Sequence, residues 1–145
     1  MKQLLLPIKW YVVSSIYLLI IILFHWGLHP AIGTLVFVIG GFIGLFILDA
    51  TELAINVEPS PLRNMLTQFI IIVLAFFVVT STQTNLGSGV ILFLSLRILI
   101  GQWQDFTRDR NITSWLPQIK TEQHQIYLII ISLLQIFATL FFIFI

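Results

Sequence analysis

The sequence predicts an all-α integral membrane protein, a bundle of about five transmembrane helices joined by short loops. Two observations lead to this fold class. The 145 residues are 59% hydrophobic and only 9% charged, whereas a soluble domain carries about 25% charged residues. The mean hydropathy is +1.05, and the charged residues lie between long uncharged runs. A soluble fold could not bury this much apolar surface, so we treat residues 1–145 as one membrane domain.

The uncharged runs set the number of helices. Residues 10–48, 64–96 and 123–145 contain no Asp, Glu, Lys or Arg, and a membrane-spanning helix needs about 20 residues. The first two runs are therefore long enough for two helices each, and the third run for one. Turn residues divide the two long runs. The predicted spans lie near 8–27, 31–55, 63–82, 88–108 and 123–144.

The first span follows a short basic segment that resembles the start of a secretory signal peptide. Its apolar part extends from Trp10 to about Trp26, which is longer than the apolar core of such a peptide, and no A-x-A cleavage site follows. We therefore expect a retained helix. His25 and His29 share the i, i+4 spacing of metal ligands, but Gly27 interrupts the helix between them. Because no third ligand is near, interfacial histidines are the preferred interpretation.

The second span carries a stripe of glycines. Gly33, Gly40 and Gly44 lie within about 40° of one another at about 100° per residue. A stripe without side chains lets another helix backbone approach closely, so we expect these glycines to pack against a neighbouring helix. Asp49 and Glu52 lie on a different face at the far end of the same span. The sequence thus predicts that packing and polar chemistry are separated on this helix.

The third span, residues 63–82, is almost entirely apolar and has no feature that suggests more than a structural role. The fourth carries Arg97 within an apolar segment. A charge in the middle of a membrane costs about 2.5 to 3.5 kcal/mol, so Arg97 should face protein or water, or extend to the interface with its stem against lipid. Both interpretations stay open, as does a re-entrant fourth segment, which would move the C-terminus to the other side.

If Arg97 is paired, its depth favours an acid at the end of the second span, Asp49 before Glu52. Asp105 is the competing acid, but it lies eight residues along the same helix, about 12 Å at 1.5 Å per residue. Arg108 and its acidic neighbours should form a solvated, self-paired helix end. Trp115 is expected at the inner membrane interface, with the segment around it flat in the headgroup region.

The fifth span places Gln135 near the middle of the membrane. A polar amide in hydrocarbon favours contact with another helix, so we expect the face that contains Gln135 to pack inside the bundle. Together with the three glycines of the second span, Gln135 is a predicted helix-packing residue.

Charge asymmetry predicts the orientation. The basic residues that flank the membrane on the side of the N-terminus are Lys2, Lys9, Arg63, Arg108, Arg110 and Lys120. Arg97 can extend toward that side, and the opposite loops contain no Lys or Arg. Because basic loops stay in the cytoplasm, we expect a multi-pass protein of the cell membrane with a cytoplasmic N-terminus and an exterior C-terminus.

Two classes of function follow. The preferred class is a structural or accessory membrane subunit that packs against lipid and against a partner subunit or a second copy. The alternative is a small transporter or channel in which Asp49, Glu52 and Arg97 line a cavity on the cytoplasmic side.

Enzyme chemistry is not favoured. The chain has no Cys, no HExxH, no P-loop and no Ser-His-Asp order. We therefore assign no catalytic, cofactor-binding or metal-binding residue. The net charge of +1 does not suggest a nucleic-acid partner.

Overall fold

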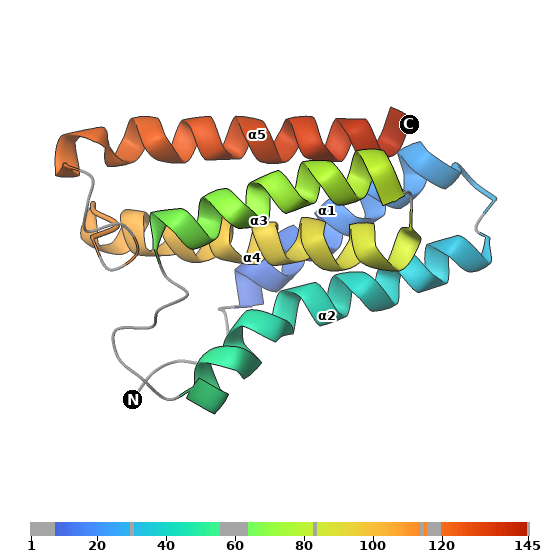
Figure 1. Ribbon diagram of the computed structural model, residues 1–145, viewed down its shortest axis with the longest axis horizontal. Coiled ribbons are helices and arrows are strands. Elements are labelled where there is room, and N and C mark those ends of the chain that lie inside the picture. Colours follow the sequence, from blue (N-terminus) through green and yellow to red (C-terminus); the bar gives the residue numbers. More distant parts are fainter. Residues whose placement is uncertain are drawn as a thin grey trace.

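The computed structural model of the chain describes residues 8–29, 31–55, 64–82, 84–113, 115 and 120–144, and this part folds into an all-α bundle (Figure 1). Two short turns adjoin the helices, a π-helical turn η1 (Val78–Thr82) after α3 and a 3-10 turn η2 (Thr121–Gln123) before α5. No strand occurs among the described residues. The helices are α1 (Ile8–Trp26), α2 (Ile32–Ile55), α3 (Met65–Phe77), α4 (Asn85–Asp109) and α5 (His124–Phe144).

The fold class expected from composition is confirmed, and each helix overlaps one of the predicted segments. Four helical segments are long and apolar enough to cross a membrane, namely α1, α2, α4 and Thr121–Phe144. The fourth helix is continuous for 25 residues, which is long enough to span and argues against the re-entrant alternative. The shortest apolar helix is instead the third, Met65–Ser81.

The helix that carries Arg97 forms the centre of the bundle. Helix α4 contacts α2, α3 and α5, whereas α1 contacts α2 and α5. Every residue from Ser88 to Gln102 is buried except Val90 and Leu94, which are half-buried. By contrast, the only buried residues of α1 are Ser14 and Ile21. A helix enclosed on nearly every side can carry polar residues at a depth where a lipid-facing helix could not.

Local hydrogen bonds and backbone conformation explain where α3 begins and where α4 ends. Asn64 has an extended backbone, and its side-chain oxygen accepts a hydrogen bond of 2.8 Å from the Thr67 amide, which starts α3. Arg110 adopts a left-handed backbone with φ 61, and its amide donates to the Phe106 carbonyl oxygen at 2.8 Å. This left-handed residue ends α4 and turns the chain back toward the bundle.

The core divides into two clusters along the bundle. The first extends from the α1–α2 turn to Ile100 of α4, and within it Phe37 stacks on Phe142 with ring centroids 4.8 Å apart and also contacts the Phe93 ring. The second contains Leu48 of α2, Ile98 and Leu99 of α4, Ile112, Trp115, and Leu128 and Ile131 of α5. Many large apolar side chains on α1, α2, α3 and α5 point outward. That surface suits a hydrocarbon environment and would aggregate in water.

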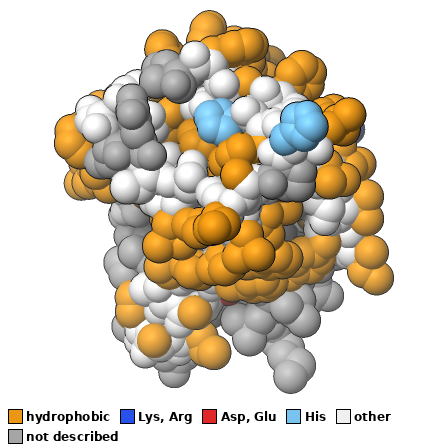
Figure 2. Space-filling view, turned by 90° about the vertical axis from the view of Figure 1, so that its right-hand side faces the viewer, with side chains coloured by type: hydrophobic (Ala, Val, Ile, Leu, Met, Phe, Trp, Pro, Cys, Tyr) orange, Lys and Arg blue, Asp and Glu red, His pale blue; other side chains and the backbone are white. Residues whose placement is uncertain are grey.

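Charged side chains gather where α1 begins, α2 and α4 end, and α5 begins. We call this the charged end; its described members are Lys9, Glu52, Asp105, Arg108, Asp109, Arg110, Lys120 and Glu122. Lys2 and Arg63, which also flank the membrane in the predicted orientation, lie outside the described residues. Figure 2 shows the opposite end, where orange apolar side chains and pale-blue histidines are seen.

Candidate functional site

The glycines of α2 lie directly against the backbone of α4. A Cβ atom at Gly40 would lie 2.5 Å from the Leu86 carbonyl oxygen and 3.1 Å from the Val90 amide nitrogen. A Cβ atom at Gly44 would clash with the Val90 carbonyl oxygen. Such distances leave room for hydrogen only, so the two backbones touch, and the predicted close approach of another helix is present.

Gly89 of α4 completes this contact from the other side. A Cβ atom there would clash with the Phe37 carbonyl oxygen and lie 3.0 Å from the Gly41 amide nitrogen. We call the contact of Gly40, Gly44 and Gly89 the glycine seam. Sequence reasoning missed Gly89 because it lies at the end of the polar run TSTQTNLGSG, which suggests a loop. The residues four positions before and after it are an asparagine and a phenylalanine, so the sequence shows no stripe of small residues there.

Gly33 has a different neighbour. A Cβ atom at this position would lie 2.5 Å from Nδ2 of Asn85, a side chain at the start of α4. The residue is half-buried. The stripe therefore runs from a side-chain contact at Gly33 to backbone contacts at Gly40 and Gly44.

Arg97 and Asp49 form a two-point ion pair between α4 and α2. Nη2 of Arg97 donates to Oδ1 of Asp49 at 2.8 Å, and Nε donates to Oδ2 at 3.2 Å. The two side chains are 7% and 15% exposed. Charge-assisted bonds of this forked kind are among the stronger hydrogen bonds in proteins. The expected pairing of Arg97 with Asp49 is therefore present, and Glu52 lies about one turn further along α2, half-buried.

This ion pair shows that α4 contacts two different faces of α2. The sequence predicts that the glycines and the acids lie on separate faces of the helix, and Gly44 and Asp49, although on different faces, both contact α4. Five residues separate them, about 140° around the helix at about 100° per residue. The long side chain of Arg97 spans that angle, so one neighbouring helix meets both faces.

Gln135 joins three helices in a buried hydrogen-bond network. Its Nε2 donates to the Leu92 carbonyl oxygen of α4 at 3.1 Å and to the Tyr17 hydroxyl of α1 at 3.0 Å. Its Oε1 accepts from the Ser95 hydroxyl, and the Tyr17 hydroxyl is hydrogen-bonded to Thr139. Gln135 is buried, and its face of α5 lies against α1 and α4.

A second amide cluster was not foreseen. Gln68 of α3 and Gln102 of α4 exchange hydrogen bonds of 3.0 and 2.8 Å through their side-chain amides, and the Tyr127 hydroxyl of α5 donates to Gln68. Both glutamines are buried. In the sequence, each glutamine is a polar residue beside an apolar stretch, which could have suggested a buried polar contact. The sequence does not show which helices bring the two residues together.

Trp115 packs inside the protein, although the sequence led us to expect its segment to lie flat in the headgroup region. It is 2% exposed and lies over Gly101, and its Nε1 donates to Oδ2 of Asp105 at 2.7 Å. The reason is the chain reversal after α4, which turns this residue back into the core. Residues 114 and 116–119 around it lie outside the described part. Arg108 pairs with Asp105 at 3.2 Å and with Asp109 at 3.0 Å, the self-paired helix end that was predicted.

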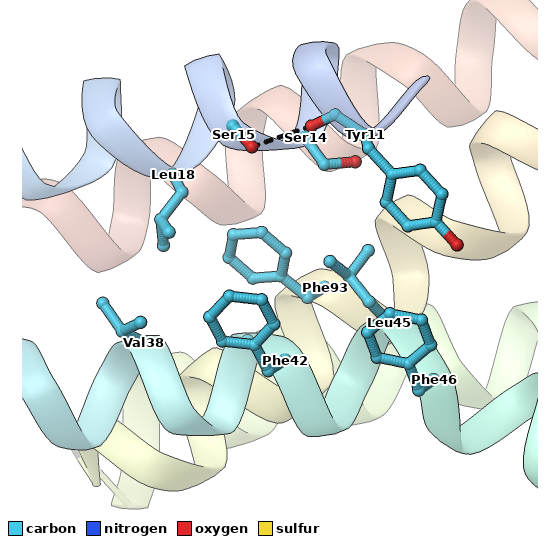
Figure 3. Close-up of a pocket in the computed structure, with 10 residues that line it drawn as sticks. Tyr11, Ser14, Ser15, Leu18, Val38, Phe42, Leu45, Phe46 and Phe93 are labelled. Carbon is cyan, nitrogen blue, oxygen red and sulfur yellow. Dashed lines mark hydrogen bonds between the residues drawn. The ribbon is translucent and has the colours of Figure 1, made fainter. Parts of the chain in front are cut away.

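Three cavities in the described part have mostly apolar linings. A cleft of about 60 Å³ between α1 and α2 is lined by aromatic and aliphatic side chains and two serines (Figure 3). The hydroxyls of Ser14 and Ser15 donate to carbonyl oxygens of their own helix at 2.9 and 2.8 Å. A groove of about 240 Å³ lies between α1 and α5, and one of about 270 Å³ lies along the end of α5.

These cavities do not include the charged residues. Arg97, Asp49 and Glu52 line none of the three. Among the described residues, no group of three or more His, Cys, Asp or Glu side chains is placed to hold a metal ion. Nδ1 of His25 lies 3.2 Å from the Ile143 carbonyl oxygen, so this histidine is engaged with α5.

The interior polar groups therefore connect helices to one another. Arg97 and Asp49 link α2 with α4, Gln135 links α1, α4 and α5, and the glutamine pair links α3 with α4. No protein-family model, curated protein or solved structure matches the chain.

Proposed function

We propose that the chain is a structural or accessory subunit of a membrane, whose work is to present a rigid helical bundle to lipid and to a partner subunit or a second copy. The observation that carries this proposal is the ion pair of Arg97 and Asp49. A transport pathway keeps charged groups along a water-filled passage. Here the guanidinium is bound at two points by Asp49 in the contact between α2 and α4, and its side chain is 7% exposed.

The outer surface supports the proposed contact with lipid and with a partner subunit or a second copy. Helix α1 buries only Ser14 and Ile21, and large apolar side chains cover the outside of the other peripheral helices. Within a bilayer, lipid tails are as apolar as leucine, so such a surface accepts either lipid or another helix.

The proposed orientation places the charged end in the cytoplasm. Lys9, Arg108, Arg110 and Lys120 are at this end, and basic residues near spans favour the cytoplasmic side. Helix α5 runs from the charged end to the opposite end (Figure 1), so its last turn is exterior.

Flux measurements test the proposal against transport. The purified chain is reconstituted into liposomes and offered a panel of inorganic ions and small charged solutes, with protein-free vesicles as the reference. We expect no solute to move faster than in the reference. A solute that moves faster with the native chain, and at the reference rate with Asp49→Asn, would replace the proposal with the transporter alternative.

A size measurement tests association. Native membranes are solubilised in mild detergent, and the mass of the species that contains the chain is compared with the 16.6 kDa of one copy. We expect a heavier species of defined composition after subtraction of the detergent. A monomer in every detergent, and in nanodiscs of native lipid, would contradict the accessory role.

A further inference from the structure

We propose that the Trp115 side chain covers the ion pair of Arg97 and Asp49 at the charged end and limits the access of water to it. Gly101, which has no side chain, leaves the space that the indole occupies. We call this arrangement the seal. The seal is a device of the fold and does not depend on the proposed function. It rests on the packing over one glycine, on the hydrogen bonds that hold the Trp115 segment, and on the position of the indole along α4.

The first observation is the space above Gly101. A Cβ atom there would lie 2.6 Å from Cζ2 of Trp115 and 3.1 Å from Nη1 of Arg97. The edge of the indole and Nη1 of the guanidinium therefore both lie close to the space that the side chain of a larger residue at position 101 would occupy. Gly101 is one turn from Arg97 toward the charged end, so the indole covers the guanidinium on that side.

The second observation is the way Trp115 is held. Its Nε1 donates to Oδ2 of Asp105 at 2.7 Å, so the ring spans the helical turn from Gly101 to Asp105. Its amide donates to the Ile112 carbonyl oxygen at 2.9 Å. The Ile112 amide in turn donates to Nδ1 of His124 on α5 at 3.0 Å. Ile112, Trp115 and His124 are all fully buried or nearly so.

The third observation concerns the guanidinium itself. Nε and Nη2 of Arg97 bind Asp49, and among the described residues no hydrogen bond is formed by Nη1. Water reaching Nη1 would hydrate the cation and weaken its attraction to Asp49, because charges attract more strongly in a dry surrounding. An aromatic ring over this turn of α4 therefore limits the access of water to the pair, whose side chains are 7% and 15% exposed.

The absence of native cysteines allows a direct test. Leu48 adjoins Asp49 and belongs to the same core cluster as Trp115. In a Leu48→Cys chain, the rate of reaction with a membrane-impermeant maleimide measures how readily water reaches this place. Ile21→Cys, in the other cluster, is the matched reference because both residues are buried, Ile21 at 0% and Leu48 at 4% exposed.

We expect Trp115→Ala to raise the reaction rate at position 48 at least tenfold and to leave the rate at position 21 unchanged. Gly101→Ala should displace the indole and raise the rate at position 48 in the same direction, which provides a second variant that keeps the tryptophan. Trp26→Ala removes the same side chain near the opposite end and should leave position 48 protected.

Three results would overturn the proposal. The first is a thiol at position 48 that stays unreactive in both Trp115→Ala and Gly101→Ala. The second is a thiol that reacts as fast with native Trp115 as without it. The third is an equal rise at positions 48 and 21, because a local seal must leave the other cluster closed.

Discussion

Replacing Gly40 by alanine should separate α2 from α4. The added Cβ would lie 2.5 Å from the Leu86 carbonyl oxygen, whereas ordinary contact begins at 3.4 Å. The backbones must therefore move apart by the difference, 3.4 minus 2.5, or 0.9 Å. A gap of about 0.5 to 1 Å forfeits a quarter to a half of the dispersion energy of each contact across it.

The magnitude follows from the size of the seam. A buried leucine makes about 40 to 60 atomic contacts at about 0.1 to 0.2 kcal/mol each. If the glycine seam makes a similar number, the separation costs about 1 to 6 kcal/mol, and overpacked cores typically lose about 1 to 3 kcal/mol. Alanine also favours a helix over glycine by about 0.5 to 1 kcal/mol. This gain in helix stability must be subtracted from the measured change in the free energy of unfolding before the cost of the clash is known.

Gly41→Ala provides that correction. Gly41 is the next residue on the same helix, and its Cβ would meet the Phe93 ring at 3.1 Å, a side chain that can shift, instead of a backbone. The difference in the free energy of unfolding between Gly40→Ala and Gly41→Ala should be about 1 to 3 kcal/mol. Reversible unfolding in mixed detergent and dodecyl sulfate measures it, and leucine at position 40 or 44 should abolish folded yield. Equal stabilities of the two alanine variants would refute the reasoning and show that the seam is not tight.

Four further predictions concern single contacts. In a double-mutant cycle with Arg97→Ala and Asp49→Ala, the coupling should be about 0.5 to 3 kcal/mol in the same unfolding assay, and strict additivity would mean that the pair is not formed. Thr84→Cys should react with an impermeant maleimide from outside intact cells, and labelling only after permeabilisation would reverse the proposed orientation. Gln135→Leu should cost about 0.6 to 2 kcal/mol, because Ser95 and Tyr17 lose a partner, and an unchanged unfolding midpoint would contradict this. Arg110→Gly should stabilise the chain by about 0.5 to 1 kcal/mol, because glycine adopts a positive φ without strain; a loss of stability would show that the arginine side chain contributes more than its backbone costs.

The sequence by itself determined the helices and the distribution of charge between the two ends. The physical reason is local: hydrocarbon requires each spanning segment to satisfy its own backbone, so runs of apolar residues of sufficient length must be helical. Depth along a helix is also readable from sequence. For this reason Arg97 and Asp49 were expected to meet before any contact was seen.

Only the tertiary structure decided which helix faces meet. Within lipid every apolar face is acceptable, so composition does not show that α4 is central or that Gly89 lies against α2. The glutamine pair of α3 and α4 has the same origin, because both residues lie on helices whose rotation is set by their neighbours. Trp115 depends on a left-handed turn at Arg110, a residue with no preference for that backbone. Contacts between distant segments follow from how the whole bundle packs, and no local pattern in the chain encodes them.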